Sequence, residues 1–175
     1  MKVRFEEIPW EGLHLEITDE SWFPESELSH TGPVVARMDL EKRDHRVLVE
    51  GVLQVALILD CDRCLKQYEQ PLNLNFKVDL EVSEDPAVEE SSAADHSSGE
   101  SEMDVITLEA PEVDIASILK QQLFLALPAK NLCSPECKGL CPHCGTNLNE
   151  KSCDCSLREK SSPFAVLVEL KKIEE

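Results

Sequence analysis

Eight cysteines, grouped in closely spaced pairs, constrain this chain more than any other feature of its sequence. The N-terminus, Met1-Lys2-Val3-Arg4-Phe5-Glu6-Glu7, lacks the apolar run of a secretory signal peptide. The chain also contains no run of eighteen apolar residues, the length that a membrane-spanning helix would need. We therefore expect a cytoplasmic protein. Because disulfides are rare in that compartment, the cysteines indicate metal ligands or redox thiols.

The spacing within the pairs is typical of tetrahedral zinc sites. The candidate ligands are Cys61 with Cys64, Cys133 with Cys137, Cys141 with Cys144, and Cys153 with Cys155. Two residues separate the members of the first and third pairs, which lets two thiolates point at one ion from a tight turn. Eight thiols suit two sites of four thiolates each, so we expect one or two structural Zn²⁺ ions.

The positions of the pairs predict which of them share an ion. The last four cysteines lie within fifteen residues and can close a local zinc ribbon. Cys61 and Cys64 would then join Cys133 and Cys137, which would tie the sheet to the segment after the helix. One occupied site with leftover thiols is the main alternative, and His143 could replace a cysteine.

Catalysis is not expected at these sites. A catalytic zinc keeps one coordination position open for water, whereas thiolates here are in surplus. No Glu or His occupies an obvious base position, so we expect no catalytic residue and no enzyme.

The charge of the chain is concentrated in one segment. Thirteen of the Asp and Glu residues, and no Lys or Arg, lie between Asp79 and Asp114, which leaves 22 acidic against 17 basic residues elsewhere. We interpret residues 83–103 as an acidic disordered insertion. The net charge of −18 argues against nucleic acid as a partner, but its concentration in one segment weakens that argument, and the acidic segment itself suits a basic protein partner.

Three stretches predict strands, at residues 34–40, 47–59 and 72–82, the last with strict alternation of apolar and polar residues. The second and third would form a hairpin-like unit with Cys61 and Cys64 at its tip. After the acidic insertion, we expect ordered structure to resume at residues 105–108. Asp114 is a good N-cap for a helix from Ile115 to about Leu127, which Pro128 would end.

These elements predict an α+β fold, with a mainly antiparallel sheet of long hairpin strands covered by two helices, plus a Cys-rich, zinc-ribbon-like segment. An N-terminal arm, residues 1–32 with Trp10 and Trp22, would pack on the sheet. The other expected parts are the strands (33–82), the acidic insertion (83–103), a strand and helix (104–130), the Cys-rich module (131–156) and a C-terminal helix (157–175) that opens at Ser162-Pro163.

Three motifs carry a family resemblance: residues 61–65 (CDRCL), 125–128 (LALP) and 137–149 (CKGLCPHCGTNLN). Together they resemble the YceD family, bacterial and plastid proteins associated with accumulation of large-subunit ribosomal RNA. The resemblance implies a small non-enzymatic factor that supports normal 23S ribosomal RNA levels, and hence large-subunit biogenesis.

The expected partner is therefore a ribosomal protein, a large-subunit precursor or the ribosomal RNA itself, with no membrane and no small-molecule substrate. Five basic residues near the cysteines are candidates for contact with RNA phosphates: Lys130, Lys138, Lys151, Arg158 and Lys160. The alternative function is a zinc-thiol redox switch, in which oxidation would release zinc and expose apolar surface.

Overall fold

The chain forms two compact units. The computed structural model describes residues 1–82 and 104–157. The first unit comprises Met1–Leu59 and Glu69–Ala129, and the second comprises Asp60–Tyr68 and Lys130–Glu175.

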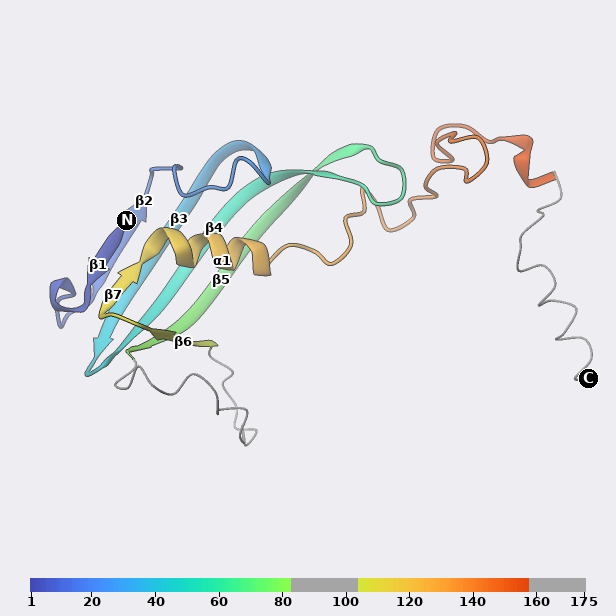
Figure 1. Cartoon of the computed structure of the whole chain (residues 1–175). Coiled ribbons are helices and arrows are strands. Elements are labelled where there is room, and N and C mark those ends of the chain that lie inside the picture. The colour runs from blue at the N-terminus through green and yellow to red at the C-terminus, as the bar shows by residue number, and fades with distance from the viewer. Residues whose placement is uncertain (83–103, 158–175) are drawn as a thin grey trace, which may run out of the picture. The chain divides into compact units, whose positions relative to one another are not determined.

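A five-stranded sheet dominates the first unit (Figure 1). Its strands, in spatial order, are β2 (Leu13–Ile17), β3 (Ser29–Arg43), β4 (Arg46–Asp60), β5 (Gln67–Val82) and β6 (Asp104–Leu108). The three long strands predicted from the sequence are present, and each extends beyond its predicted range. β3 and β4 are antiparallel and meet at a tight turn in which Asp44 has a φ of 51°.

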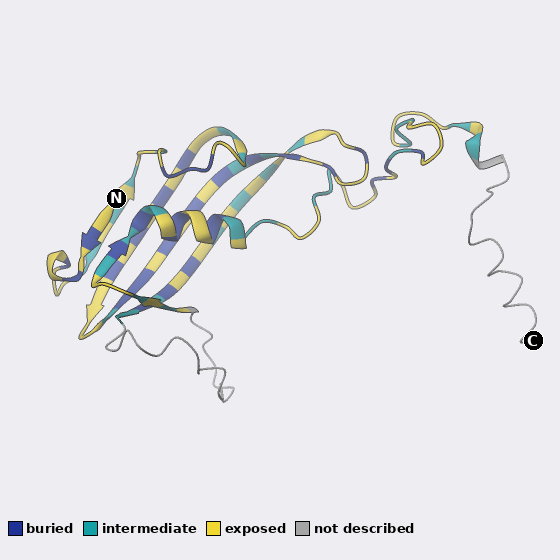
Figure 2. Ribbon diagram, viewed as in Figure 1, coloured by how far each residue is buried: buried dark blue, intermediate teal, exposed yellow. Residues whose placement is uncertain are grey.

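Alternating burial explains why these segments form strands. Every second residue of β4 is buried from Val49 through Leu59, and the residues between them are more exposed (Figure 2). This period of two places one apolar face of the sheet against the interior and leaves the other wet. Gly51 interrupts the apolar series because the ring of Phe76 lies directly over it, where a Cβ would be 2.1 Å from the ring Cζ.

One helix, α1 (Ile115–Leu125), covers a face of the sheet (Figure 1). The carboxylate of Asp114 accepts a hydrogen bond from the Ser117 backbone at 3.2 Å, as expected for the predicted N-cap. The helix ends two residues before the predicted position, at Leu125. The helix residues that are buried are Ile115, Ile118, Leu119, Gln122 and Leu123. Among the described residues, Nε2 of Gln122 is buried without a hydrogen-bond partner.

The N-terminal segment contributes three short elements: β1 (Lys2–Arg4), the 3₁₀ helix η1 (Phe5–Glu7) and β2. β1 pairs antiparallel with β7 (Glu112–Asp114), directly before α1, and β2 pairs antiparallel with β3. Trp22 and Phe23 are buried, whereas Trp10 is 88% exposed. The aromatic residues of this segment therefore divide between the core and the surface.

The sheet is mixed, because β6 lies parallel to β5. The described residues contain a single α-helix, so the second covering helix, expected within residues 157–175, is not confirmed; residues 158–175 lie outside the described part of the chain. The acidic insertion, residues 83–103, also lies outside it. No helix in the described ranges is long and apolar enough to cross a membrane.

The part of the second unit that the structure describes has little regular structure (Figure 1). Its described residues contain one short 3₁₀ helix, η2 (Asp154–Leu157), and an isolated antiparallel bridge between Leu140 and Asn147. All eight cysteines belong to this unit. The buried side chains among its described residues are those of four cysteines, Cys61, Cys64, Cys137 and Cys141.

Candidate metal centres

The first centre consists of Cys61, Cys64, Cys133 and Cys137. Their four sulfur atoms all lie within 4.8 Å of one another. Two of the separations are 3.8 Å, between Cys61 and Cys137, and 3.6 Å, between Cys64 and Cys133. The first centre therefore joins chain segments about seventy residues apart in sequence.

A tight turn positions the first two cysteines. The backbone N–H of Leu65 donates to the Cys61 carbonyl at 2.9 Å, and the Cys61 N–H donates to the Lys66 carbonyl at 3.0 Å. Leu65 adopts a φ of 57°, a left-handed conformation that is unusual for a side chain of this size. The turn thus places both sulfurs on the same side of the backbone.

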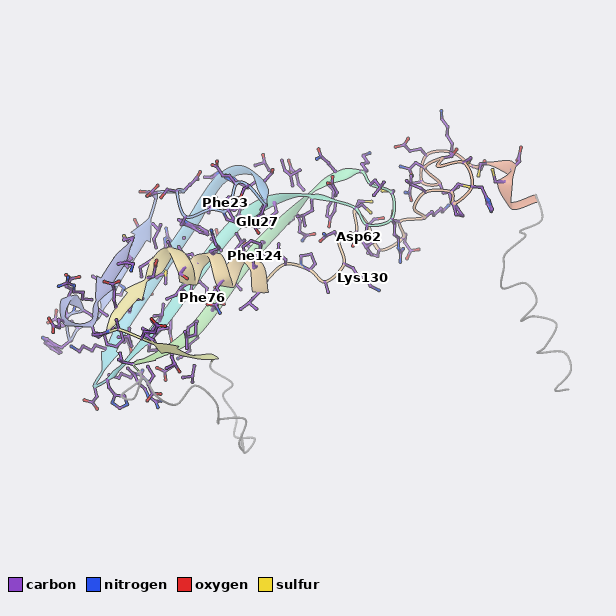
Figure 3. The ribbon with its side chains drawn as sticks, in the orientation of Figure 1. Phe23, Glu27, Asp62, Phe76, Phe124 and Lys130 are labelled. Atoms are coloured by element: carbon purple, nitrogen blue, oxygen red, sulfur yellow. The ribbon has the colours of Figure 1, made fainter. Side chains whose placement is uncertain are left out.

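Two sets of hydrogen bonds hold this turn against the segment that carries Cys133 and Cys137. Asp62 (labelled in Figure 3) donates its backbone N–H to the Asn131 carbonyl at 2.7 Å, and its carboxylate accepts from the Asn131 N–H at 2.8 Å. The Arg63 guanidinium donates to the Cys137 carbonyl at 2.8 Å, and the Arg63 carbonyl accepts from Leu140 at 3.0 Å. These bonds hold the four sulfurs together from outside the cluster.

A glycine allows the close approach of the two segments. Gly139 has a φ of +75°, and a Cβ there would lie 2.9 Å from the Arg63 carbonyl oxygen. Any other residue would be strained by its backbone conformation and would also press on Arg63.

The first centre is surrounded by apolar side chains. Cys61, Cys64 and Cys137 are buried, and the side chains packed against them belong to Tyr68, Leu132, Cys133 and Leu140. This small apolar cluster excludes water from most of the donor atoms.

The second centre consists of Cys141, Cys144, Cys153 and Cys155, whose sulfurs also lie within 4.8 Å of one another. Its first pair lies on a turn built like that of the first centre. The Gly145 N–H donates to the Cys141 carbonyl at 2.9 Å, and Gly145, like Leu65, has a positive φ, here 72°. This centre is more open to solvent, because Cys144 is exposed and both cysteines of the other pair are half-buried.

The thiols in each centre differ in acidity. A hydrogen bond from the backbone of Cys133 lowers the pKa of Cys61 to about 6, and one from the Thr146 side chain lowers the pKa of Cys144 to about 6. Burial raises the pKa of Cys133 to about 12, and the hydrogen bond with Cys144 raises the pKa of Cys155 to about 12. At neutral pH each metal-free centre therefore holds both thiolates and thiols.

The donor sets fit a divalent metal ion with tetrahedral coordination. Zn–S bonds of about 2.3 Å in a tetrahedron place the sulfurs about 3.8 Å apart. The separations of 3.6 and 3.8 Å in the first centre agree with this value and are far longer than a disulfide bond of about 2.05 Å.

The structure brings all eight predicted cysteines together, in the two groups of four that their spacing suggested. His143 is exposed between Cys141 and Cys144 and belongs to neither group. Of the basic residues considered for RNA contact, Lys130, Lys138 and Lys151 are exposed in the second unit. Arg158 and Lys160 lie outside the described residues.

Two residues that support the sulfurs were not identified from the sequence. Arg63 bonds across to the second pair, and Asn149 donates from its side-chain amide to the Cys137 sulfur at 3.3 Å. The signals available for Asn149 were its place in a loop between two cysteine pairs and at the end of the motif 137–149, and neither specifies a contact with a different pair.

Comparison with known proteins places the chain in a family. The family model described as "Large ribosomal RNA subunit accumulation protein YceD" matches residues 49–171, a range that includes all eight cysteines. The chain belongs to the YceD family. The YceD match begins within β4, so it leaves out the N-terminal segment and β3.

Plant and mycobacterial proteins are among the similar sequences. A Zea mays protein named "Large ribosomal RNA subunit accumulation protein YCED homolog 1, chloroplastic" is 31% identical over 147 residues, covering 72% of this chain and 50% of the plant protein. The Arabidopsis thaliana protein of the same name is 26% identical, covering 80% of this chain and 49% of the relative. An uncharacterized Mycobacterium tuberculosis protein is 31% identical, covering 65% and 52%.

The chain therefore spans about half the length of the curated YceD relatives that it matches. No solved structure matches it.

Proposed function

We propose that this protein is a non-enzymatic factor for biogenesis of the large ribosomal subunit, which supports accumulation of 23S ribosomal RNA. Membership of the YceD family is the observation that carries this proposal. The proposed location is the cytoplasm.

Both cysteine groups are proposed to hold structural Zn²⁺. Soft thiolates select zinc over hard cations, and four protein ligands fill a tetrahedral ion with no position left for a reacting water. The sulfur separations in the first centre support this assignment. The burial of three of its four thiols favours a stable fold element over an oxidisable thiol switch. The role of the ions would be to hold the second unit in one conformation.

Charge favours a basic protein as the direct partner. The described residues of the second unit contain equal numbers of acidic and basic side chains: Asp60, Asp62, Glu136, Glu150 and Asp154 against Arg63, Lys66, Lys130, Lys138 and Lys151. Each Zn²⁺ with four thiolates would add about two negative charges. A unit with this balance would attract a basic ribosomal protein more readily than RNA phosphates.

The proposed cellular role can be tested by depletion. Cells lacking the protein are expected to show a reduced ratio of 23S to 16S ribosomal RNA, which the wild-type gene restores. A variant with Cys61→Ser and Cys144→Ser is expected not to restore the ratio. An unchanged ratio after complete depletion would contradict the proposal.

The partner can be tested with purified components. Zinc-loaded protein is mixed with separated large-subunit proteins in one experiment and with a 23S transcript in another, each over a series of salt concentrations. We expect a stable complex with a basic ribosomal protein. RNA binding that weakens steeply with salt, and that is lost when Lys130, Lys138 and Lys151 are changed to Ala, would assign the contact to RNA instead.

A further inference from the structure

Asn149 links the two candidate metal centres. It lies in the loop between the two cysteine pairs of the second centre, yet its side chain reaches a ligand of the first. Its amide Nδ2 donates to the sulfur of Cys137 at 3.3 Å. One residue of the second centre's loop therefore supports the donor set of the first.

The orientation of this amide is determined by its other partners. Oδ1 of Asn149 accepts a hydrogen bond from the Lys138 backbone at 2.8 Å, and Nδ2 also donates to Oδ1 of Asn147 at 2.8 Å. Rotation of the amide by 180° would place its oxygen against the Asn147 oxygen and its nitrogen against a backbone donor. The network therefore holds Nδ2 toward the sulfur.

The loop itself is attached to the segment that joins the two centres. Leu148 donates its N–H to the Gly139 carbonyl at 2.9 Å, and Asn147 pairs with Leu140. Residues 138–140 run directly from Cys137 of the first centre to Cys141 of the second.

The ends of the same loop are held by the second centre. Cys144 precedes it and Cys153 follows it, so an ion bound to both would close the loop. Without that ion, the described contacts that keep the loop in place are hydrogen bonds to residues 137–141, such as those of Leu148 with Gly139 and of Asn149 with Lys138. Segments held in this way open at low free-energy cost.

We infer that the two metal centres are coupled through Asn149, so that metal in the second centre raises the affinity of the first. The inference rests on the proposed metal sites and adds a positioning residue to them. Hydrogen bonds to metal ligands typically change metal affinity by about 10- to 100-fold, and we expect about tenfold here. By linkage, metal in the first centre must raise the affinity of the second by the same factor.

Three sets of variants of the full chain test the coupling. Cys153→Ser with Cys155→Ser empties the second centre, and Cys61→Ser with Cys64→Ser empties the first. Asn149→Ala removes all side-chain bonds, whereas Asn149→Asp keeps an acceptor for Lys138 and lacks the donor for Cys137. Asn75→Ala, at an exposed position of β5, is the matched control. Zn²⁺ affinity is measured by competition with a chromophoric chelator, and Co²⁺ absorption counts the thiolate sites.

With both centres intact, Asn149→Ala and Asn149→Asp should each weaken the first centre about tenfold, and Asn75→Ala should not. In the protein with an emptied second centre, the Zn²⁺ affinity of the first centre should already be lower by that factor, and Asn149→Ala should lower it little further. Emptying the first centre should lower the Zn²⁺ affinity of the second by the same factor.

Two results would overturn the coupling while leaving the metal sites in place: an unchanged first-centre affinity in both Asn149 variants, or an equal loss whether or not the second centre is filled. Failure of every protein, wild type included, to bind Zn²⁺ or Co²⁺ would overturn the proposed metal sites, and with them the coupling.

Discussion

The contact between Gly51 and Phe76 shows how a glycine in a strand makes room for an aromatic ring of the neighbouring strand. The Phe76 ring occupies the space where a Cβ at Gly51 would lie, and Phe76 is itself buried. Gly51→Ala should therefore lower the free energy of unfolding by about 1–3 kcal/mol through overpacking. Chemical denaturation measures the change. Combining Gly51→Ala with Phe76→Leu should recover part of the loss, and full additivity of the two losses would contradict the contact.

Leu65 and Gly145 occupy equivalent positions in the two cysteine turns, with φ values of 57° and 72°. A non-glycine residue in this conformation lowers the free energy of unfolding by about 1–2 kcal/mol. Replacing it with glycine removes this strain, but part of the gain is offset because glycine raises the conformational entropy of the unfolded chain. Leu65→Gly should therefore leave stability unchanged or raise it by up to about 1 kcal/mol, even though it deletes a large side chain that is 67% exposed. Gly145→Leu should be destabilising. Thermal unfolding of the zinc-loaded proteins compares them, and a marked loss in Leu65→Gly would show that the leucine has a packing role.

At the scale of elements, the start of α1 depends on one carboxylate. Asp114 ends β7 and accepts the hydrogen bond from Ser117 that begins the helix. Asp114→Ala should destabilise the first unit by about 1 kcal/mol, whereas Asp114→Ser should retain most of the stability. Thermal or urea unfolding distinguishes them, and equal losses in the two variants would indicate that the cap contributes nothing.

The two metal centres differ in the length of chain that each would close. The first centre joins segments about seventy residues apart, whereas the four cysteines of the second lie within fifteen residues. Cys61→Ser should release both segments of the second unit, since the first centre joins residues distant in sequence. Cys144→Ser should release only residues near 141–157. Native mass spectrometry should count one zinc in each variant and two in Ser134→Ala. Hydrogen exchange should then show protection lost at residues 61–66 in the first variant only; the same exchange pattern in both would indicate a single shared site.

At the scale of the whole molecule, metal content should depend on pH. Zinc must displace protons from the two thiols whose pKa is about 12, and below pH 6 also from the two whose pKa is about 6. Zinc affinity should therefore rise with pH throughout the range 5 to 8, with the steepest slope at the acidic end. Chelator competition at each pH measures this, and a flat profile would contradict the assigned thiol acidities.

Much of the fold could be predicted because its signals are local. Strict alternation identified β5, apolar and β-branched runs identified β3 and β4, and Asp114 identified the start of α1. The spacing of the cysteines suggested the two groups that the structure brings together. The parallel pairing of β5 with β6 and the pairing of β1 with β7 could not be predicted, because neither strand carries a signal for its neighbour. Asn149 was missed for the same reason, since a hydrogen bond across a fold has no local pattern.

The register of β6 has a consequence for engineering this protein. Val78 pairs with Asp104 and Val82 with Leu108, so the chain leaving β5 has to return only four residues along the strand, about 13 Å, before β6 begins. A connection of about eight residues could cover that distance, and 21 residues connect Val82 to Asp104. The site is therefore suited to a shortened connector or to insertion of an affinity tag or a fluorescent domain, which would leave the cysteine-rich unit and both chain ends untouched.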